Sequence, residues 1–182
     1  MKVVIINGHA GCGKSTFIDL CRKHPKADVY EFSMVDAAKT MAKVVGWTEK
    51  QKSPKDRKFL SDLKDLIDEY NDGSFEYLKF LLHNYVYSHD LDKEVVVFIN
   101  AREAADIKRL CNTFNAKSLV IRRKEVESIP ASNHADANWW NYSYDYAVDN
   151  NDGLDFLEKN SQNFIDFILK EDWEYDQEKC NL

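Results

Sequence analysis

The residues with the clearest chemistry lie near the start of the chain, in the octapeptide GHAGCGKS at positions 8–15. Glycines let a backbone curl until successive N–H groups face one concavity, which suits the oxygens of a phosphate group. Lys14 adds a positive charge beside those oxygens, and the hydroxyl of Ser15 is a suitable ligand for magnesium. The octapeptide therefore predicts a site that binds a polyphosphate together with Mg²⁺.

The flanking residues supply the elements that such a loop needs. Residues 1–7 (MKVVIIN) form an apolar run that favours a buried parallel strand, and residues 13–23 carry apolar side chains at helical spacing. A strand before and a helix after Gly-x4-Gly-Lys-Ser is the context of a P-loop, and the helix turns its positive end toward the anion. A glycine-rich turn without a ligand is the weaker alternative. The residues expected to bind ATP are Gly8, Ala10, Gly11, Cys12, Gly13, Lys14, Ser15 and Thr16.

The rest of the chain alternates strand and helix patterns. Further strands are expected at 28–33, 95–99, 118–121 and 144–148. Further helices are expected at 35–45, from about 54 to 70, and at 74–88, 102–113 and 153–169. Strands separated by helices predict an α/β protein with the three-layer P-loop NTPase fold, in which helices cover both faces of a five-stranded parallel sheet. We expect one domain over residues 1–182, and a loosely held tail from Glu171.

Composition narrows the classes of function. The 182 residues carry a net charge of −6, which argues against a general nucleic-acid binder. The four cysteines have no metal-ligand spacing, and we expect free thiols in a reducing compartment. The N-terminal apolar run is too short for a signal peptide, and no run is long enough for a membrane span. These features predict a soluble cytoplasmic protein.

The residues after the predicted strands distinguish among P-loop proteins. No Asn-Lys-x-Asp guanine-reading motif occurs, and the strand 95–99 ends in Asn100 where motor ATPases place a carboxylate. Magnesium would then rest on Ser15, the phosphates and water, with Glu103 or Asp36 assisting through water.

The chain holds only six arginines against nineteen lysines. Four of the six arginines fall near predicted strand ends or at a helix start, namely Arg57, Arg102, Arg122 and Arg123. Guanidinium groups hold phosphate in two places at once, and phosphoryl transfer needs such cations. The pattern therefore predicts a kinase.

The whole chain resembles the nucleoside monophosphate kinase group, and most closely the deoxynucleoside monophosphate kinase-like proteins of bacteriophages and some bacteria. The resemblance runs from residue 1 to about residue 168. It rests on GHAGCGKST, SMVDAAKTMAKVVGW, KDRKFLSDLKDLIDEYNDG, FINAREAADIKRL and NHADANWWNYSYDYAVDNNDGLDFL. The resemblance implies transfer from ATP to a (deoxy)nucleoside 5′-monophosphate, giving the diphosphate and ADP. A phage origin would imply the cytoplasm of a host cell.

The resemblance also implies roles for particular residues. Arg102 would contact the acceptor phosphate, while Arg122 and Arg123 would belong to a lid at 123–143 that closes on the transferring group. Asn150, after the last strand, would lie in a loop that touches the adenine. Residues 34–90 would form the acceptor-binding lobe. The polar candidates for acceptor binding there and at its edge are Ser33, Asp36, Arg57 and Lys58.

Structural roles compete with several of these assignments. Lys58 pairs at i,i+4 with Asp62 on a solvated helix face as readily as it binds a substrate. Asp36 and Ser33 could serve a helix N-terminus instead, and Glu103 fits a first helical turn. A surface role is favoured for His134, and packing for Trp139 and Trp140.

Two other functions remain open. The acceptor could be a phosphorylated metabolite, as in phosphomevalonate kinase, or the chain could be a nucleotide-binding regulatory module that transfers nothing. The regulatory module would show slow hydrolysis and partner-dependent binding. For a kinase we expect a small-molecule substrate as the partner, rather than a nucleic-acid polymer or a membrane. The sequence leaves open the base and sugar of the acceptor and the oligomeric state.

Overall fold

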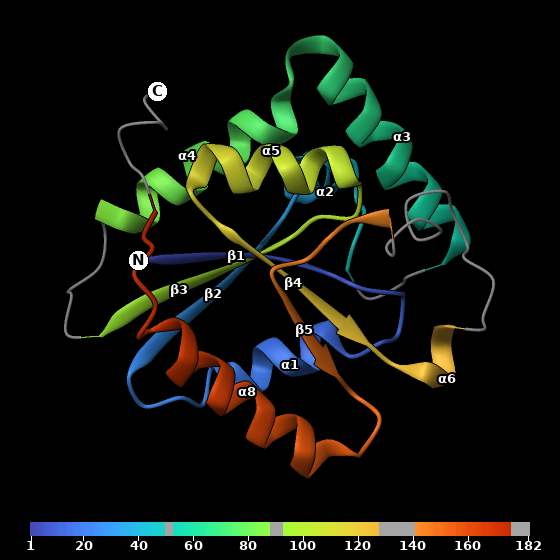
Figure 1. Cartoon of the computed structure of the whole chain (residues 1–182). Helices are drawn as coiled ribbons and strands as arrows, with labels where there is room; N and C mark the ends of the chain where they lie inside the picture. Colours follow the sequence, from blue (N-terminus) through green and yellow to red (C-terminus); the bar gives the residue numbers. More distant parts are fainter. Residues whose placement is uncertain (50–52, 88–92, 128–140, 176–182) are drawn as a thin grey trace. The chain divides into compact units, whose positions relative to one another are not determined.

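The computed structural model describes residues 1–49, 53–87, 93–127 and 141–175 (Figure 1). The chain divides into two compact units, one formed by residues 1–31 and 91–181 and the other by residues 32–90. We call them the sheet unit and the helical unit. Among the described residues, no helix is both long and apolar enough to cross a membrane.

Five strands form one sheet in the spatial order β2-β3-β1-β4-β5. They are β1 (Lys2–Asn7), β2 (Ala27–Ser33), β3 (Glu94–Asn100), β4 (Lys117–Arg122) and β5 (Tyr146–Asp149). β1 runs parallel to β3 and β4, and β4 runs parallel to β5. The register pairs Ile6 with Asn100 and Arg122 with Asp149, so the carboxyl ends of four strands meet at one edge. Ligands bind at this edge in open α/β sheets.

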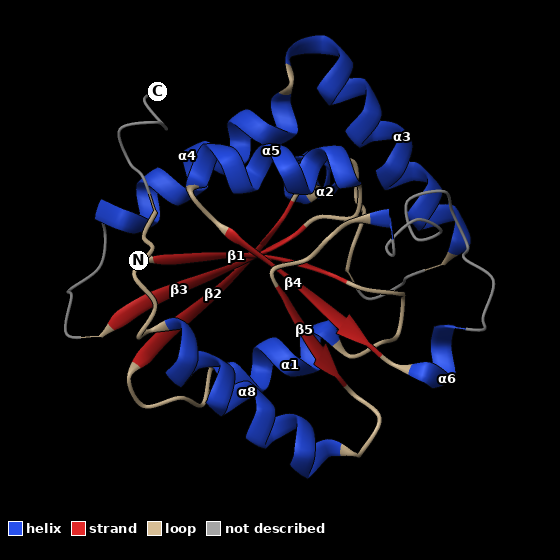
Figure 2. Cartoon of the chain, viewed as in Figure 1, coloured by secondary structure: helices blue, strands red, loops and turns tan. Residues whose placement is uncertain are grey.

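Helices cover both faces of the sheet, with α1 (Lys14–Cys21) and α8 (Leu154–Ile168) on one side and α5 (Ala104–Phe114) on the other (Figure 2). Alternate residues of β1 divide between the two faces. Val4 and Ile6 join the cluster that contains Phe17 of α1 and Phe164 of α8. Every residue of β1 is buried, which explains its continuous apolar run because neither face is exposed to water. The predicted α/β fold is confirmed.

The helical unit contains α2 (Asp36–Val44), α3 (Pro54–Asn71) and α4 (Gly73–Tyr87). All three helices pack against one another. α3 begins at Ser53, whose hydroxyl accepts from the Asp56 backbone N–H at 3.1 Å, while the Asp56 carboxylate accepts from the Ser53 backbone N–H at 3.1 Å. This reciprocal pair is a capping box, and it fixes where the helix starts.

No residue of α3 is buried, although its apolar side chains recur at helical spacing. Leu66 is 63% exposed and Tyr70 is 86% exposed. Among its apolar residues, Leu60, Leu63 and Ile67 are half-buried.

Residues 171–175, the start of the tail that the sequence predicted to be loosely held, are attached to the sheet unit by hydrogen bonds. The ammonium of Lys2, a buried residue, donates to the backbone oxygen of Glu171 at 2.7 Å and to that of Trp173. Trp173 is itself buried, and the Tyr175 N–H donates to the Met1 oxygen at 3.1 Å. The acidic composition of the tail did not indicate this attachment, because backbone carbonyl oxygens rather than side chains accept the hydrogen bonds from Lys2.

The other expected elements are present with small shifts at their ends. The last strand begins at Tyr146 rather than at Tyr144. The reason is that the Asp145 N–H donates to the hydroxyl of Ser118 at 3.0 Å, and its carboxylate accepts from the Ser118 N–H at 2.8 Å. Side-chain bonds thus replace the strand ladder there. A short helix that was not predicted, α6 (Lys124–Glu127), follows β4.

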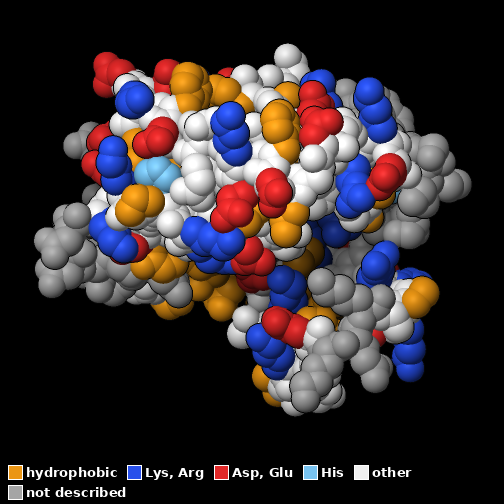
Figure 3. Space-filling view, turned by 90° about the horizontal axis from the view of Figure 1, so that it is seen from below, with side chains coloured by type: hydrophobic (Ala, Val, Ile, Leu, Met, Phe, Trp, Pro, Cys, Tyr) orange, Lys and Arg blue, Asp and Glu red, His pale blue; other side chains and the backbone are white. Residues whose placement is uncertain are grey.

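On the face drawn in Figure 3, acidic and basic side chains are interspersed. Ion pairs also bring opposite charges together at α1 and its following turn, where Lys23 lies 2.8 Å from Glu158 and Arg22 pairs with Asp19 and with Glu31. Mixed signs of this kind differ from the basic stripe typical of nucleic-acid binders.

Candidate phosphate-binding site

The loop from Gly8 to Lys14 connects the carboxyl end of β1 to the first turn of α1. Gly8, Gly11 and Gly13 all have positive φ, at 141°, 81° and 102°. A Cβ on Gly8 would lie 2.3 Å from the Ile121 backbone oxygen, and one on Gly13 would lie 2.4 Å from Nδ2 of Asn150. Both ends of the loop therefore require glycine for space as well as for conformation.

Lys14 curls over the loop that precedes it. Its Nζ donates to the backbone oxygens of Gly8 at 2.6 Å and His9 at 3.1 Å, and lies 3.8 Å from Sγ of Cys12. The lysine is half-buried, whereas Ser15 and Thr16 are exposed at the start of α1. The ammonium is thus placed over the concavity of the loop, and the two hydroxyls stand at the positive end of the helix.

Cys12 and His9 have structural surroundings within the loop. Burial raises the pKa of the Cys12 thiol, and the nearby Lys14 ammonium lowers it in part. The His9 ring nitrogen Nδ1 lies 2.8 Å from the oxygen of Ala10. Cys12, Cys21 and Cys111 are free thiols, as expected, while Cys180 lies outside the described residues.

A cavity of about 280 Å³ lies beside the loop. Its lining residues are Gly11, Gly13, Thr16, Arg123, Glu125, Asn150, Asn151, Gly153, Leu154 and Leu157. The structure therefore brings Asn150 and Arg123, two residues singled out from the sequence, to the same cavity as the glycine loop. The leucines give the cavity an apolar wall, and the side chains of Thr16, Arg123 and the two asparagines give it a polar one.

Asn150 also supports the loop directly. Its Nδ2 donates to the Cys12 oxygen at 2.9 Å, and its backbone N–H donates to the Arg122 oxygen at 2.8 Å. Asn150 thus ties the loop to the end of β4, a role that the sequence did not suggest. Arg122 is exposed on the last residue of β4, and Arg123 pairs with Glu125 at 2.5 Å. Most of the predicted lid, residues 128–140 with His134, Trp139 and Trp140, lies outside the described residues.

Asn7 is a residue that sequence reasoning missed. It is 2% exposed, and its Oδ1 accepts from the Gly8 N–H at 2.8 Å. Its Nδ2 donates to the Arg102 backbone oxygen at 3.2 Å and to the Tyr144 hydroxyl at 2.8 Å. Burial raises the pKa of Tyr144 to about 12, so the phenol is neutral at ordinary pH. In the sequence, the only indication of a role for Asn7 was its position as a polar residue at the end of an apolar strand.

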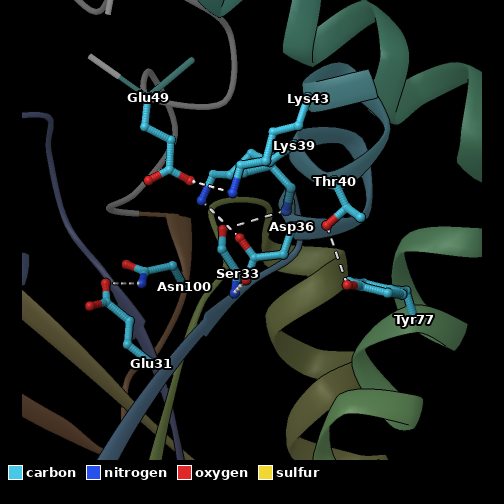
Figure 4. Close-up of polar contacts among 10 residues, drawn as sticks. Glu31, Ser33, Asp36, Lys39, Thr40, Lys43, Glu49, Tyr77 and Asn100 are labelled. Atoms are coloured by element: carbon cyan, nitrogen blue, oxygen red, sulfur yellow. Dashed lines mark hydrogen bonds and ion pairs between the residues drawn. The ribbon is translucent and has the colours of Figure 1, made fainter. Parts of the chain in front are cut away.

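The end of β3 shows a second contact that the sequence did not indicate. Nδ2 of Asn100 donates to Oε1 of Glu31 at 2.8 Å (Figure 4). Glu31 lies on β2 and pairs through Oε2 with Arg22 at 3.2 Å. The amide at the end of β3 therefore orients a carboxylate on another strand. Arg102, which follows β3, has an exposed side chain.

In the helical unit, Asp36 serves the start of α2. Its Oδ2 accepts from the Ser33 N–H at 2.7 Å, and its Oδ1 accepts from Lys39 at 2.8 Å (Figure 4). Lys58 donates to both oxygens of Asp62, at 2.9 and 2.6 Å, and both side chains are exposed. These contacts match the structural alternatives raised for Asp36 and Lys58, whereas Ser33 does not cap α2, whose N-cap residue is Val35. Arg57 is exposed in the first turn of α3.

The comparisons with known proteins bear on the fold. No family model and no curated protein matches the sequence. Among solved structures, TT1252 from Thermus thermophilus is 14% identical with a TM-score of 0.52, covering 92% of this chain and 97% of its own.

Shikimate kinase from Bacteroides thetaiotaomicron is 13% identical with a TM-score of 0.44, covering 93% of this chain and 99% of its own. A sugar kinase from Janibacter sp. is also 13% identical, with a TM-score of 0.46 and coverages of 91% and 95%. The likeness to TT1252 shows a shared fold, and an identity of 14% leaves the substrate undetermined. The chain has the α/β fold of P-loop proteins.

Proposed function

We propose that this chain is an ATP-dependent kinase whose acceptor is a nucleoside or deoxynucleoside 5′-monophosphate. The observation that carries the proposal is the meeting of the glycine loop with Arg123 and Asn150 around one cavity. The loop and Lys14 would hold the β- and γ-phosphates of ATP, and the cavity would receive the remainder of the nucleotide. The arginine would neutralise charge on the transferring group, because its guanidinium can contact two phosphate oxygens.

Magnesium fits the residues present. The exposed hydroxyl of Ser15 stands at the first turn of α1, next to the concavity of the loop. Among the described residues, no group of three or more His, Cys, Asp or Glu could hold a metal ion by itself. A magnesium ion carried by the phosphates and water needs only one or two protein ligands, and Ser15 would supply one. The ion would offset the charge on the phosphate oxygens.

In the transfer itself, an oxygen of the acceptor's phosphate forms a bond to the γ-phosphorus of ATP. The bond from that phosphorus to the β,γ-bridging oxygen breaks, and ADP leaves with the bridging oxygen. Lys14 and Arg123 would stabilise the negative charge on the phosphoryl group during transfer. Arg102 would hold the acceptor phosphate in line with the bond that breaks. Arg122 keeps its proposed role in closure, and Ser33 and Arg57 keep theirs in acceptor binding, whereas Asp36 and Lys58 are engaged in the structural contacts described above.

The nucleotide acceptor rests on the resemblance noted in the sequence, over residues 1 to about 168, and on the arginine after β3. The test is a screen in which ADP formation from MgATP is followed with each common ribo- and deoxyribonucleoside monophosphate. A second set holds phosphorylated metabolites that lack a base. We expect turnover with at least one nucleotide. Turnover only in the second set would overturn the nucleotide acceptor, and ATP binding without transfer to either set would overturn the kinase.

A further inference from the structure

We propose that Asn7 is a positioning residue that couples the phosphate-binding loop to Arg102, so that one buried amide sets the geometry of both donor and acceptor. The inference rests on the proposed function for the roles of the loop and of Arg102. It goes beyond that function because Asn7 would touch neither substrate.

The first observation is that every hydrogen of the amide is used. Asn7 ends β1 and is 2% exposed. Its Oδ1 accepts from Gly8 at 2.8 Å, and its two Nδ2 hydrogens serve the Arg102 oxygen at 3.2 Å and the Tyr144 hydroxyl at 2.8 Å. This buried amide has one orientation, because its partners lie on three separate segments. Rotating it by 180° would place Nδ2 against the Gly8 N–H and Oδ1 against the Arg102 oxygen.

The second observation concerns the loop. Because the Gly8 N–H points at Asn7, this group is not available to a phosphate, and the anion-binding donors start later in the loop. Gly8 is also confined by the Ile121 oxygen and by Sγ of Cys12, which would lie 2.3 and 2.8 Å from a Cβ. The Asn7 side chain therefore fixes the direction in which the loop leaves the sheet.

The third observation concerns the segment that carries Arg102. The ladder between β1 and the residues after β3 continues through the Ala101 N–H, which donates to the Ile6 oxygen at 3.3 Å. The Asn7 side chain adds the next bond, to the oxygen of Arg102. Two residues later the chain enters α5 at Ala104. Asn7 thus holds the backbone from which the Arg102 side chain projects.

Tyr144 offers a matched control because it is the third partner of the same amide and belongs to neither segment. Tyr144→Phe removes one bond from Asn7 and leaves the bonds to Gly8 and Arg102. Asn7→Asp keeps an oxygen for the Gly8 N–H and loses the donor to Arg102. The two variants both disturb a buried hydrogen-bond network, but only one disturbs the coupling.

The experiment measures transfer kinetics and thermal unfolding for wild type, Asn7→Asp, Tyr144→Phe, Arg102→Ala and the Asn7→Asp/Arg102→Ala double variant. We expect Asn7→Asp to lower kcat/KM for the acceptor by about tenfold or more, the size expected when a buried acceptor loses its donor. KM for ATP should change by less than about threefold, because the loop keeps its Gly8 bond. Tyr144→Phe should lower the melting temperature and leave kcat/KM within about twofold.

The double variant separates positioning from a general loss of structure. In the Arg102→Ala background, Asn7→Asp should cost less than about twofold, since the group that it positions is gone. A full additive loss would overturn the proposal. So would a loss of kcat/KM in Tyr144→Phe equal to that in Asn7→Asp.

A readout without transfer keeps this proposal distinct from the kinase assignment. Amide exchange is measured over residues 8–16 and 101–106 with and without MgATP. We expect MgATP to protect both segments in the wild type and only the first in Asn7→Asp. Equal protection of residues 101–106 in both proteins would overturn the coupling. If the wild type binds MgATP without transferring to any acceptor, the kinase assignment fails and the exchange result alone decides on Asn7.

Discussion

The sheet unit and the helical unit are stabilised by different means. In the sheet unit every residue of β1 is buried and the glycine loop is confined by backbone atoms. In the helical unit α3 has no buried residue, and its polar contacts include a capping box and the exposed ion pair Lys58–Asp62. Backbone geometry therefore determines the proposed donor site, whereas exposed side chains determine the proposed acceptor lobe.

This difference has a consequence for substitutions. A site built from backbone N–H groups tolerates few changes at its glycines, because each fixes a conformation and a close contact. A lobe that binds through exposed side chains can change its ligand with little effect on stability. Substitutions at the loop glycines of the sheet unit should therefore cost both activity and stability, whereas substitutions of exposed side chains in the helical unit should separate the two.

The largest effect is expected for Lys14→Ala. Removing a positive charge that would face the transferring phosphates should lower kcat by about 10²–10³-fold. Unfolding should change little, because the Lys14 ammonium is bonded to carbonyl oxygens and the Cys12 sulfur of its own loop. Steady-state kinetics and thermal unfolding measure both, with Lys23→Ala as the control for loss of a lysine paired at the surface. Wild-type turnover in Lys14→Ala would contradict the donor site.

The next effect is on stability and compares one glycine from each unit. Gly8→Ala should lower the free energy of unfolding by about 3 kcal/mol or more, since its Cβ would meet the Ile121 oxygen at 2.3 Å in a strained conformation. Gly46→Ala should cost only about 1 kcal/mol, because a φ of +86° is strained but nothing lies within 4 Å. Urea unfolding measures both. Equal losses would remove the distinction between the units.

A smaller effect separates Arg57 from Lys58 in the helical unit. Arg57→Gln should raise KM for the acceptor by about tenfold, the size of one lost charge-assisted hydrogen bond. Lys58→Gln should change it by less than about twofold, because its ammonium is exposed and already paired with Asp62. The melting temperatures of both variants should match the wild type. The opposite ranking of KM would place the acceptor on Lys58 instead.

The smallest effect concerns the start of α3. Ser53→Ala removes the hydroxyl that accepts from the Asp56 N–H and should lower the free energy of unfolding by about 1 kcal/mol. Ser61→Ala, inside the same helix, should change it by less than half as much, since alanine favours helix interiors. Denaturant unfolding compares the two. A larger loss for Ser61→Ala would show that the capping box is not what fixes this helix.

Much of the fold could be predicted because its causes are local. The apolar run of β1, the glycines of the loop and the spacing of the buried residues in α8 each determine their element without help from distant residues. The same holds for the conformation of the proposed phosphate-binding loop, because its positive φ angles occur at Gly8, Gly11 and Gly13. The shared edge of the strands follows from the alternation of strand and helix.

What could not be predicted depends on contacts between distant residues. Asn7 reaches Tyr144 and Arg102, Asn150 reaches Cys12, and Lys2 reaches Trp173, each across most of the chain. No periodicity marks such pairs, since one polar residue in a strand or loop is compatible with many partners. The burial of α3 could not be predicted for the same reason: helical spacing indicates which residues share a side, and tertiary packing decides which of them are covered.

The measurement that tests the central claim most directly is ³¹P NMR of MgATP incubated with the protein and the nucleoside monophosphates. We predict that the resonance of the γ-phosphate disappears while those of ADP and a second nucleoside diphosphate appear in equal amounts, with no inorganic phosphate. Lys14→Ala should leave the spectrum of ATP unchanged. Formation of inorganic phosphate alone, or retention of ATP beside bound protein, would contradict the account of this chain as a phosphoryl-transfer enzyme.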